Sequence, residues 1–235
     1  MILEKLFANE RNIALLIDPD KVSDSLYPVI ENHLGNSIVS SIFIGGSLVF
    51  SDTDVLTQKI KQFTNLPVLL FPGNVSQLNK FADGVMLLSL ISGRNPEFLI
   101  GQHVIAAPII RRLGLNTIPT GYMLFDCGCV NSVRYISGTL PIPNDKPDIA
   151  VATAIAGEML GMKTLYLEAG SGAKEHVSLP IIKAVKEAVK IPIIVGGGLN
   201  DIKDIENVFE SGADLVVVGT AFEKDPEMVK NLHHF

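Results

Sequence analysis

The stretch IPIIVGGGLNDIKDIENVFESGADLVVVGT, residues 191–220, decides the fold of this protein. It contains an apolar run, IPIIVGGG (191–198), a helix-like segment (201–211) and a second apolar run, ADLVVVGT (213–220). Continuous apolar runs without polar alternation are typical of parallel strands that are buried on both faces of a sheet. The stretch therefore predicts one strand–helix–strand unit of an α/β protein.

The same unit recurs along the whole chain. Six further apolar runs are IALLID (13–18), IVSSIFIGGS (38–47), PVLLFPG (67–73), GVMLLSL (84–90), TGYMLFD (120–126) and KTLYLEAGSG (163–172). Further helix-like segments are 22–34, 53–64, 95–113, 148–161, 178–190 and 225–233, with Pro147 suited to a first turn and Gly161 and Gly212 to helix ends. Eight strands in 235 residues give about 29 residues per unit, the size of a βα repeat. We predict a single (β/α)8 TIM barrel spanning residues 1–235.

Two irregularities interrupt the repeat. Between Gly73 and Gly84 only NVSQLNKFAD remains, so the third helix is predicted to be missing or stunted. Segment 74–83 is then expected to border an apolar cleft that continues to the barrel mouth near Asp18. The excursion CGCVNSVRYISGTLPIPNDKP (127–147) after the fifth strand is interpreted as an insertion that forms a small hairpin and loop.

Composition excludes several classes of protein. Hydrophobic residues make up 47% of the chain and charged residues 19%, which is enough apolar material for a sizeable core. The net charge of −6 argues against a nucleic-acid partner held by general electrostatics. No apolar run reaches the ~18 residues of a membrane span, and the first residues show no secretory signal. We expect a cytoplasmic protein.

The cysteines and histidines do not predict a metal centre. Cys127 and Cys129 stand as C-G-C, too close for ordinary disulfide geometry, and are expected to be thiols in a reducing cytoplasm. A zinc site needs two more ligands at suitable spacing, whereas His33, His103 and His176 are scattered singly.

The last three predicted strands end in small residues. In such barrels the functional groups lie at the carboxyl ends of the strands, and here those ends are 168–172, 196–198 and 219–220. Glycine lets backbone N–H groups approach an anion closely, and a helix N-terminus adds a favourable dipole. Tight turns alone also explain each glycine, but three neighbouring strand ends together indicate a phosphate site.

The motif IDPDK (17–21) closes the first strand. Pro19 keeps Asp18 out of the helical region, so Asp18 and Asp20 can present oxygens to a hard cation, with the Ser47 hydroxyl at the end of the second strand. Magnesium usually bridges one or two carboxylates and a substrate phosphate. Lys21 is a candidate for offsetting diphosphate charge. The alternatives are a turn with a helix cap for the motif and a solvated side chain for Lys21.

Glu168 stands at the entrance of the predicted phosphate turn, where a negative side chain is out of place. A carboxylate beside a bound phosphate makes sense if it engages the hydroxyl groups of the same ligand. Tyr166, two residues earlier, lies on the same side of the strand and can also hydrogen-bond that ligand. A helix cap or a salt bridge is the alternative role for Glu168.

The motifs LLIDPDK, FIGGS, PIPNDKPDIA, TLYLEAGSGA, IIVGGGL and VVVGT, in this order, resemble the geranylgeranylglyceryl phosphate synthase family. The resemblance covers nearly the whole chain, and the YLEAGSGA and DPDK blocks are specific to the family. It implies a modified barrel without a regular third helix, and a prenyltransferase. Such an enzyme joins sn-glycerol 1-phosphate to a polyprenyl diphosphate with Mg²⁺, in the first step of archaeal-type ether lipid synthesis.

The resemblance also implies roles for individual residues. The metal ligands fall on Asp18 and Ser47, and Glu168 is implied as the catalytic base. At the position where some bacterial members carry a lysine two residues before the aspartate, this chain has Leu16, which removes one phosphate contact. The glycerol 1-phosphate contacts fall on Tyr166, Leu167, Glu168, Ala169, Gly170, Ser171, Gly172, Gly197, Gly198, Gly219 and Thr220.

Two other functions stay open at the level of the sequence. One is a different phosphate-binding barrel enzyme, such as a phosphosugar isomerase or an indole-type synthase, which needs no long apolar groove. The other is a non-catalytic binder of phosphorylated ligands, which would tolerate the loss of Glu168. A homodimer is our default expectation, and the pattern does not give the length of the prenyl chain.

Overall fold

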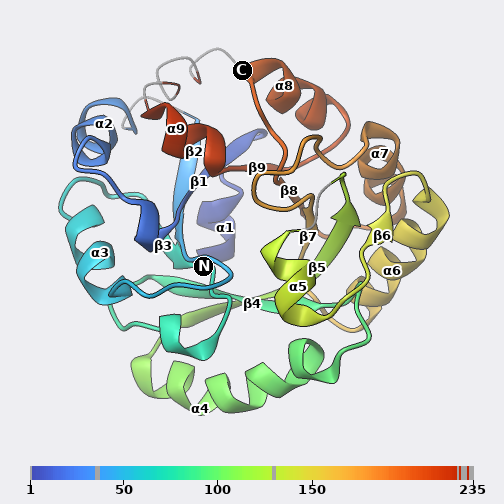
Figure 1. Cartoon of the computed structure of the whole chain (residues 1–235), viewed down its shortest axis with the longest axis horizontal. Coiled ribbons are helices and arrows are strands. Elements are labelled where there is room, and N and C mark those ends of the chain that lie inside the picture. The colour runs from blue at the N-terminus through green and yellow to red at the C-terminus, as the bar shows by residue number, and fades with distance from the viewer. Residues whose placement is uncertain (1, 35–37, 129–130, 227, 229–231, 233–235) are drawn as a thin grey trace.

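Eight parallel strands close into a barrel in the computed structural model, which describes residues 2–34, 38–128, 131–226, 228 and 232. The strand order β4-β3-β2-β1-β9-β8-β7-β5 is closed by pairing of β4 with β5, and each of these pairings is parallel. Figure 1 looks along the barrel, with the strands around its centre. The strands are β1 (Asn12–Ile17), β2 (Val39–Ile44), β3 (Val68–Leu70), β4 (Gly84–Leu90), β5 (Asn116–Asp126), β7 (Thr164–Glu168), β8 (Ile193–Gly196) and β9 (Leu215–Val218).

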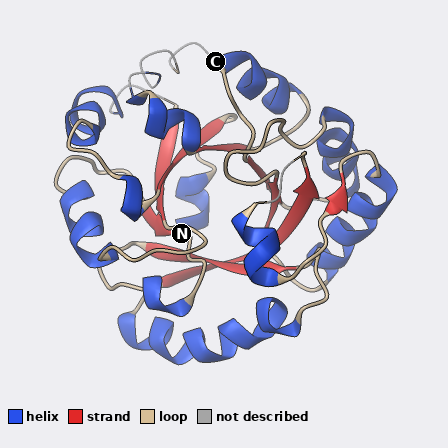
Figure 2. Cartoon of the chain, viewed as in Figure 1, coloured by secondary structure: helices blue, strands red, loops and turns tan. Residues whose placement is uncertain are grey.

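Helices surround the strands (Figure 2). The prediction of a TIM barrel is confirmed, and Pro147 lies in the first turn of its helix as expected. Gly161 and Gly212 follow helix ends with φ of 91° and 108°, a conformation that favours glycine. The helices are α1 (Ile2–Leu6), η1 (Pro19–Lys21), α2 (Leu26–His33), α3 (Thr53–Ile60), η3 (Val75–Gln77), η4 (Glu97–Gly101), α4 (Gln102–Leu113), α5 (Ser132–Ser137), α6 (Pro147–Met159), α7 (Leu179–Ala188), α8 (Ile202–Glu210) and α9 (Thr220–Lys224).

The third βα unit lacks a regular helix, as predicted. Between β3 and β4 the chain forms only the single 3-10 turn η3, which is capped by the Asn74 side chain accepting the N–H of Ser76. The remaining residues up to Gly84 are too few to cover the barrel wall with a helix of ordinary length.

The insertion at 127–147 differs from the hairpin that the sequence suggested, and that interpretation is wrong. It contains the helix α5, because Asn131 caps its first turn by accepting the N–H of Arg134 and Gly138 ends it with φ of 60°. The strand β6 (Ile142–Pro143) then pairs with the end of β5 in parallel, which a two-residue hairpin turn does not allow. Cys127 is buried, and Cys129 lies outside the described residues.

The chain ends were also predicted incompletely. The described part of the C-terminal segment contains α9 directly after β9, whereas most of the helix predicted at 225–233 lies outside the described residues. The sequence analysis did not predict α1, whose Leu6 is fully buried among the residues of the barrel interior. The hydroxyl of Ser40, near the start of β2, donates to the Leu6 carbonyl, so α1 closes the amino-terminal end of the barrel.

Two apolar cores stabilise the barrel of strands and the helices around it. One lies between the strands and the surrounding helices and includes Leu15, Val85, Leu167 and Val195. The other fills the barrel, where alternate strand residues point inward. It consists of Leu6, Ala14, Phe43, Leu69, Phe71, Met86, Leu90, Ile118, Tyr122, Leu124, Tyr166, Ile194, Leu215 and Val217. Because this interior is packed, a ligand site is left only at the open, carboxyl-terminal end.

Candidate active site

A cavity of about 330 Å³ opens at the carboxyl ends of the strands. It is where a (β/α)8 barrel carries its chemistry. Its walls include apolar side chains such as Leu88 and Phe98 as well as polar groups. Nine residues from the predicted site line it: Asp18, Lys21, Ser47, Tyr166, Glu168, Ser171, Gly197, Gly219 and Thr220.

The other predicted contacts do not line the cavity. Leu167 and Ala169 are fully buried in the core between barrel and helices, so these residues can reach a ligand only through their backbone. Gly170, Gly172 and Gly198 belong to the surrounding turns and have φ of 106°, 72° and 66°. The cavity is also lined by Leu16, so an apolar side chain occupies the position where the lysine of some bacterial members would stand.

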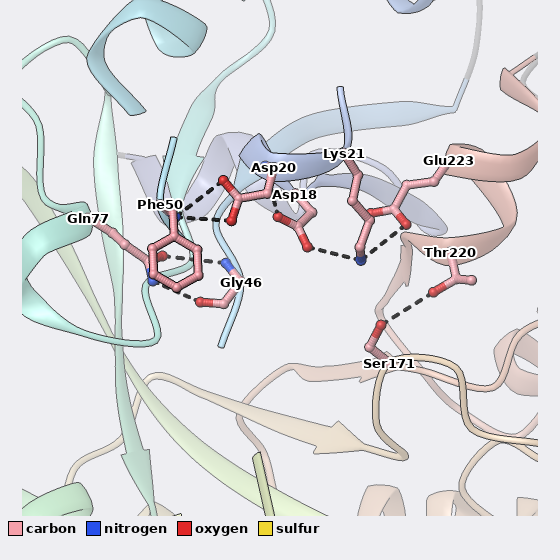
Figure 3. Close-up of polar contacts among 9 residues, drawn as sticks. All are labelled: Asp18, Asp20, Lys21, Gly46, Phe50, Gln77, Ser171, Thr220 and Glu223. Carbon is pink, nitrogen blue, oxygen red and sulfur yellow. Dashed lines mark hydrogen bonds and ion pairs between the residues drawn. The ribbon is translucent and has the colours of Figure 1, made fainter. Parts of the chain in front are cut away.

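The small residues at the last three strand ends form one continuous surface. The Ser171 and Thr220 hydroxyls lie 3.4 Å apart, which joins the end of β7 to the start of α9 (Figure 3). A Cβ atom on Gly198 would lie 2.1 Å from the Glu175 carbonyl oxygen, so only glycine lets these two turns touch. The arrangement places hydroxyls and backbone N–H groups around one end of the cavity, which suits a phosphate.

Two glycines of β8 and its turn make room for side chains of β7. A Cβ atom on Gly196 would lie 2.1 Å from the Tyr166 hydroxyl, and one on Gly197 would lie 2.6 Å from Glu168 Oε1. The sequence analysis explained the triple glycine by anion binding or by tight turns. Its tertiary contacts add a second reason, because the glycines admit the carboxylate and the phenol to the edge of the cavity.

Glu168 is buried, with only 6% of its surface exposed, although it lines the cavity. Burial raises its pKa, and hydrogen bonds from the Gly170 N–H and from the hydroxyls of Tyr122 and Tyr166 lower it again, so that the net shift is upward. The carboxylate is thus buried beside hydrogen-bond donors and still borders the cavity, where it can accept a proton from a ligand.

The sequence analysis missed Tyr122. It lies on β5 in register with Tyr166 on β7, and their rings stack with centroids 5.3 Å apart. The centroid of the Phe71 ring lies 6.2 Å from that of Tyr122 and 5.0 Å from that of Tyr166. A signal was present, because Tyr122 stands four residues before the end of a buried strand, but only the register between β5 and β7 shows which side chain it meets.

Asp18 follows β1, lines the cavity and is held by its neighbours (Figure 3). Its Oδ1 accepts the N–H of Asp20, and its Oδ2 lies 2.9 Å from the Lys21 ammonium. Lys21 also reaches Glu223 at 3.5 Å. Burial disfavours the ammonium, but these contacts with Asp18 and Glu223 outweigh it and raise the pKa of Lys21.

The prediction that Asp18 and Asp20 together present their oxygens to one cation is wrong. Asp20 turns toward the loop after β2, where its carboxylate accepts the N–H group of Phe50 at 3.0 Å (Figure 3). It also accepts the N–H group of Ser51 at 2.7 Å. The Ser51 side chain lowers the pKa of Asp20 most, and the hydrogen bonds from the Phe50 and Ser51 N–H groups lower it further. Asp20 therefore positions the loop after Ser47 and does not line the cavity.

Gln77 holds the same loop from the other side and was also missed. Its side-chain amide donates to the Gly46 carbonyl at 2.8 Å and accepts the Gly46 N–H at 3.4 Å (Figure 3). The stunted third helix thus supplies the group that fixes the residue before Ser47.

The residues around Asp18 fit a magnesium ion better than a metal held by protein alone. No group of three or more His, Cys, Asp or Glu side chains suited to a metal occurs within the described ranges. A Cβ atom placed on Gly46 would lie 3.5 Å from Asp18 Oδ1, so the carboxylate faces the backbone next to Ser47. One carboxylate and one hydroxyl beside an open cavity suit a hard cation that takes its other ligands from a substrate phosphate and water.

The insertion borders the cavity and is fastened to the loop after β7. The Asn131 amide donates to the Ala169 carbonyl at 3.4 Å, and Asn144 accepts the Ser178 N–H at 2.8 Å. Val133 and Ile136 of α5 line the cavity next to the apolar residues of β4. The insertion therefore completes an apolar wall opposite the polar strand ends.

A second cavity of about 60 Å³ lies beside the stunted helix. Asn74, Val75 and Leu78 border it, as expected for an apolar cleft next to segment 74–83. Four residues line both this cavity and the main one, so the two adjoin: Pro72, Gly73, Leu88 and Phe98.

Comparison with known proteins gives a consistent result. The model of the PcrB family matches residues 6–234. Geranylgeranylglyceryl phosphate synthase of Spirosoma linguale is 46% identical over 96% of this chain and 91% of its own length. The synthase of Methanosphaera stadtmanae is 38% identical over 92% of this chain and 89% of its own. A crystal structure of the Thermoplasma acidophilum (S)-3-O-geranylgeranylglyceryl phosphate synthase with sn-glycerol-1-phosphate superposes with a TM-score of 0.89 and 29% identity, covering 99% of this chain and 94% of that one.

Proposed function

This chain belongs to the PcrB family, and from that membership we propose that it is a prenyltransferase that joins sn-glycerol 1-phosphate to a polyprenyl diphosphate through an ether bond. The observation that carries the proposal is the buried Glu168 carboxylate, which stands between a glycine-rich phosphate surface and the cavity that leads to Asp18. This order of groups suits sn-glycerol 1-phosphate as the acceptor, because its phosphate is held at one end and its terminal hydroxyl loses a proton at the other.

The glycerol phosphate is proposed to bind with its phosphate at Ser171, Gly197 and Thr220. N–H and O–H groups there are donors, so they offset the phosphate charge without a neighbouring lysine. The glycerol then extends toward Tyr166 and Glu168, and its terminal hydroxyl donates to the carboxylate. Repulsion between phosphate and carboxylate is tolerable because the fixed dipoles hold the phosphate at the far end.

The prenyl diphosphate is proposed to bind on the other side, with its diphosphate near Asp18, Ser47 and Lys21. Magnesium, when bound there, neutralises the departing diphosphate and so favours its release. The allylic C–O bond breaks with its electron pair leaving on the diphosphate. The glycerol oxygen forms the new C–O bond, and its proton passes to Glu168.

The prenyl tail is proposed to follow the apolar wall into the second cavity beside η3. Leu88 and Phe98 border the passage between the two cavities, and Ala106 and Ile110 of α4 lie further along.

None of the helices searched, within the described residues, is long and apolar enough to cross a membrane. The cytoplasmic location and the homodimer also belong to this proposal.

Mass spectrometry of the products formed from sn-glycerol 1-phosphate and a set of prenyl diphosphates tests the function. We expect a prenylglyceryl phosphate with the mass of an ether and loss of diphosphate, dependent on Mg²⁺. Absence of product with every prenyl diphosphate, from protein that binds glycerol phosphate, would support an isomerase-type enzyme or a binding protein instead.

The tail site makes a prediction about Ala106→Phe. Ala106 is buried against the second cavity, so a phenyl ring there should shorten the space for the tail. Each methylene excluded from an apolar site costs about 0.8 kcal/mol, so losing two lowers kcat/KM about tenfold or more. We expect this fall with geranylgeranyl diphosphate and little change with geranyl diphosphate. Ile105→Phe, on the exposed side of the same helix, is the control, and equal effects of Ala106→Phe on both substrates would contradict the tail site.

The diphosphate site makes a prediction about Lys21→Met. The ammonium is half exposed, and exposed ion pairs contribute only about 0.2–1 kcal/mol, so pyrophosphate should bind about 1.4–5-fold more weakly. Calorimetry with inorganic pyrophosphate and Mg²⁺ measures this. Lys224→Met, on the exposed side of α9, is the control, and unchanged affinity of Lys21→Met would remove Lys21 from the diphosphate site.

A further inference from the structure

We propose that Tyr122 is a positioning residue of the reaction, which works with Tyr166 to hold the Glu168 carboxylate in the geometry of a base. This inference rests on the proposed function, because it concerns the group that takes the proton. The sequence analysis gave Tyr122 no role, and the contacts implied for the glycerol phosphate do not include it.

The register of the barrel brings the three residues together. On neighbouring strands, Tyr122 pairs with Tyr166, and Leu124 pairs with Glu168. Tyr122 and Tyr166 therefore share the inward face of the barrel, and their rings stack at 19° to each other. Both side chains are buried, with 5% and 1% of their surfaces exposed, and both line the cavity.

The stack fixes the position of the two hydroxyl groups. Phe71 packs on both tyrosine rings, and Phe43 stacks on Phe71 at 5.9 Å, so a row of aromatic rings crosses the barrel interior. Packed rings of this kind have few alternative rotamers. The row thus presents two phenolic hydroxyls at the level of the Glu168 carboxylate without the need for flexible side chains.

The carboxylate has a definite number of acceptor positions. An ionised carboxylate offers about four lone-pair sites. The Gly170 N–H donates to Oε1 of the carboxylate, and the hydroxyls of Tyr122 and Tyr166 lie close enough to favour its ionised form. The carboxylate also lines the cavity, so acceptor positions remain there for a ligand. The donors therefore both stabilise the ionised form and direct its remaining lone pairs toward the substrate hydroxyl.

The electrostatic surroundings assign a distinct effect to the Tyr122 hydroxyl. Burial raises the pKa of Glu168, and the hydrogen bond from Tyr122 lowers it. The other charged groups that line the cavity are Asp18 and Lys21 near η1 and Glu223 on α9. Removing only the Tyr122 hydroxyl leaves burial unchanged, so the pKa of Glu168 should rise further.

The test is the pH profile of Tyr122→Phe. The base acts when it is deprotonated, so a higher pKa moves the acid limb of kcat to higher pH. Loss of one hydrogen bond to a charged group shifts the pKa of Glu168 by about one unit. On the acid side of the profile this lowers kcat about tenfold. At alkaline pH kcat should approach that of the wild type, and the KM for glycerol phosphate should change by less than about threefold, since the hydroxyl is proposed to contact the base and not the substrate.

Matched variants separate this role from packing. Phe43→Leu removes a ring from the same aromatic row without touching Glu168, so it should lower stability and leave the acid limb in place. An unshifted acid limb in an active, folded Tyr122→Phe enzyme overturns the inference while leaving the proposed function intact. A loss of kcat that is equal at all pH values overturns it as well. If the wild-type protein forms no ether product, the proposed function fails first and independently of Tyr122.

Discussion

Glu168→Gln is expected to lower kcat by about 10²–10⁴-fold, because the variant loses the proposed general base while keeping the shape of the side chain. Gln retains an acceptor oxygen for the Gly170 N–H, and its amide can donate to a rotated tyrosine hydroxyl. The buried position therefore remains satisfied, and the fold and the glycerol phosphate site should persist. Steady-state kinetics gives kcat, and calorimetry with glycerol 1-phosphate gives the affinity.

The control for this variant is Glu175→Gln. Glu175 is an exposed carboxylate on the same loop and does not line the cavity, so its neutralisation should leave kcat within about twofold. Near-wild-type turnover by Glu168→Gln would refute the assignment of the base and leave Glu168 as a residue that only positions the ligand.

Asp18→Asn is expected to have the second large effect, a fall in kcat of about 10²-fold or more. Charge stabilisation by a bound metal is worth several kcal/mol, and Asn replaces the Asp18 carboxylate, which lines the cavity with Ser47, by a weak neutral ligand. Asn is as good a helix cap as Asp, so the turn Pro19–Lys21 should remain. Glycerol 1-phosphate should bind nearly as in the wild type, because its site lies at the last three strand ends.

Asp52→Asn is the matched control, since Asp52 caps α3 in the same way and does not line the cavity. Calorimetry of the Asp18 variant with Mg²⁺ and inorganic pyrophosphate gives a readout apart from activity, and we expect weaker binding. If Asp18→Asn abolishes the binding of glycerol 1-phosphate instead, the division into two anionic sites is wrong.

The sequence by itself determined the barrel and the location of its chemistry. Each β-strand is a short continuous apolar run because it is buried on both faces, and this pattern is local and readable without any partner. The glycines at 196–198 and the acidic residue that ends the run at 168 are likewise local features. For the same reason the gap at 74–83 was sufficient to predict the stunted third helix, which the structure confirms.

The tertiary structure alone decided which side chains meet. Asp20 follows Asp18 by two residues, yet it turns to the N–H groups of Phe50 and Ser51, 30 and 31 residues away, so the local pair is separated. Tyr122 reaches Glu168 only because β5 and β7 pair in one register, although the insertion with α5 and β6 lies between them in the chain. The physical reason is that the residues of one strand show by themselves whether the strand is buried and which residues share a face. Hydrogen bonds and ring stacking instead depend on distances between segments that are remote in sequence.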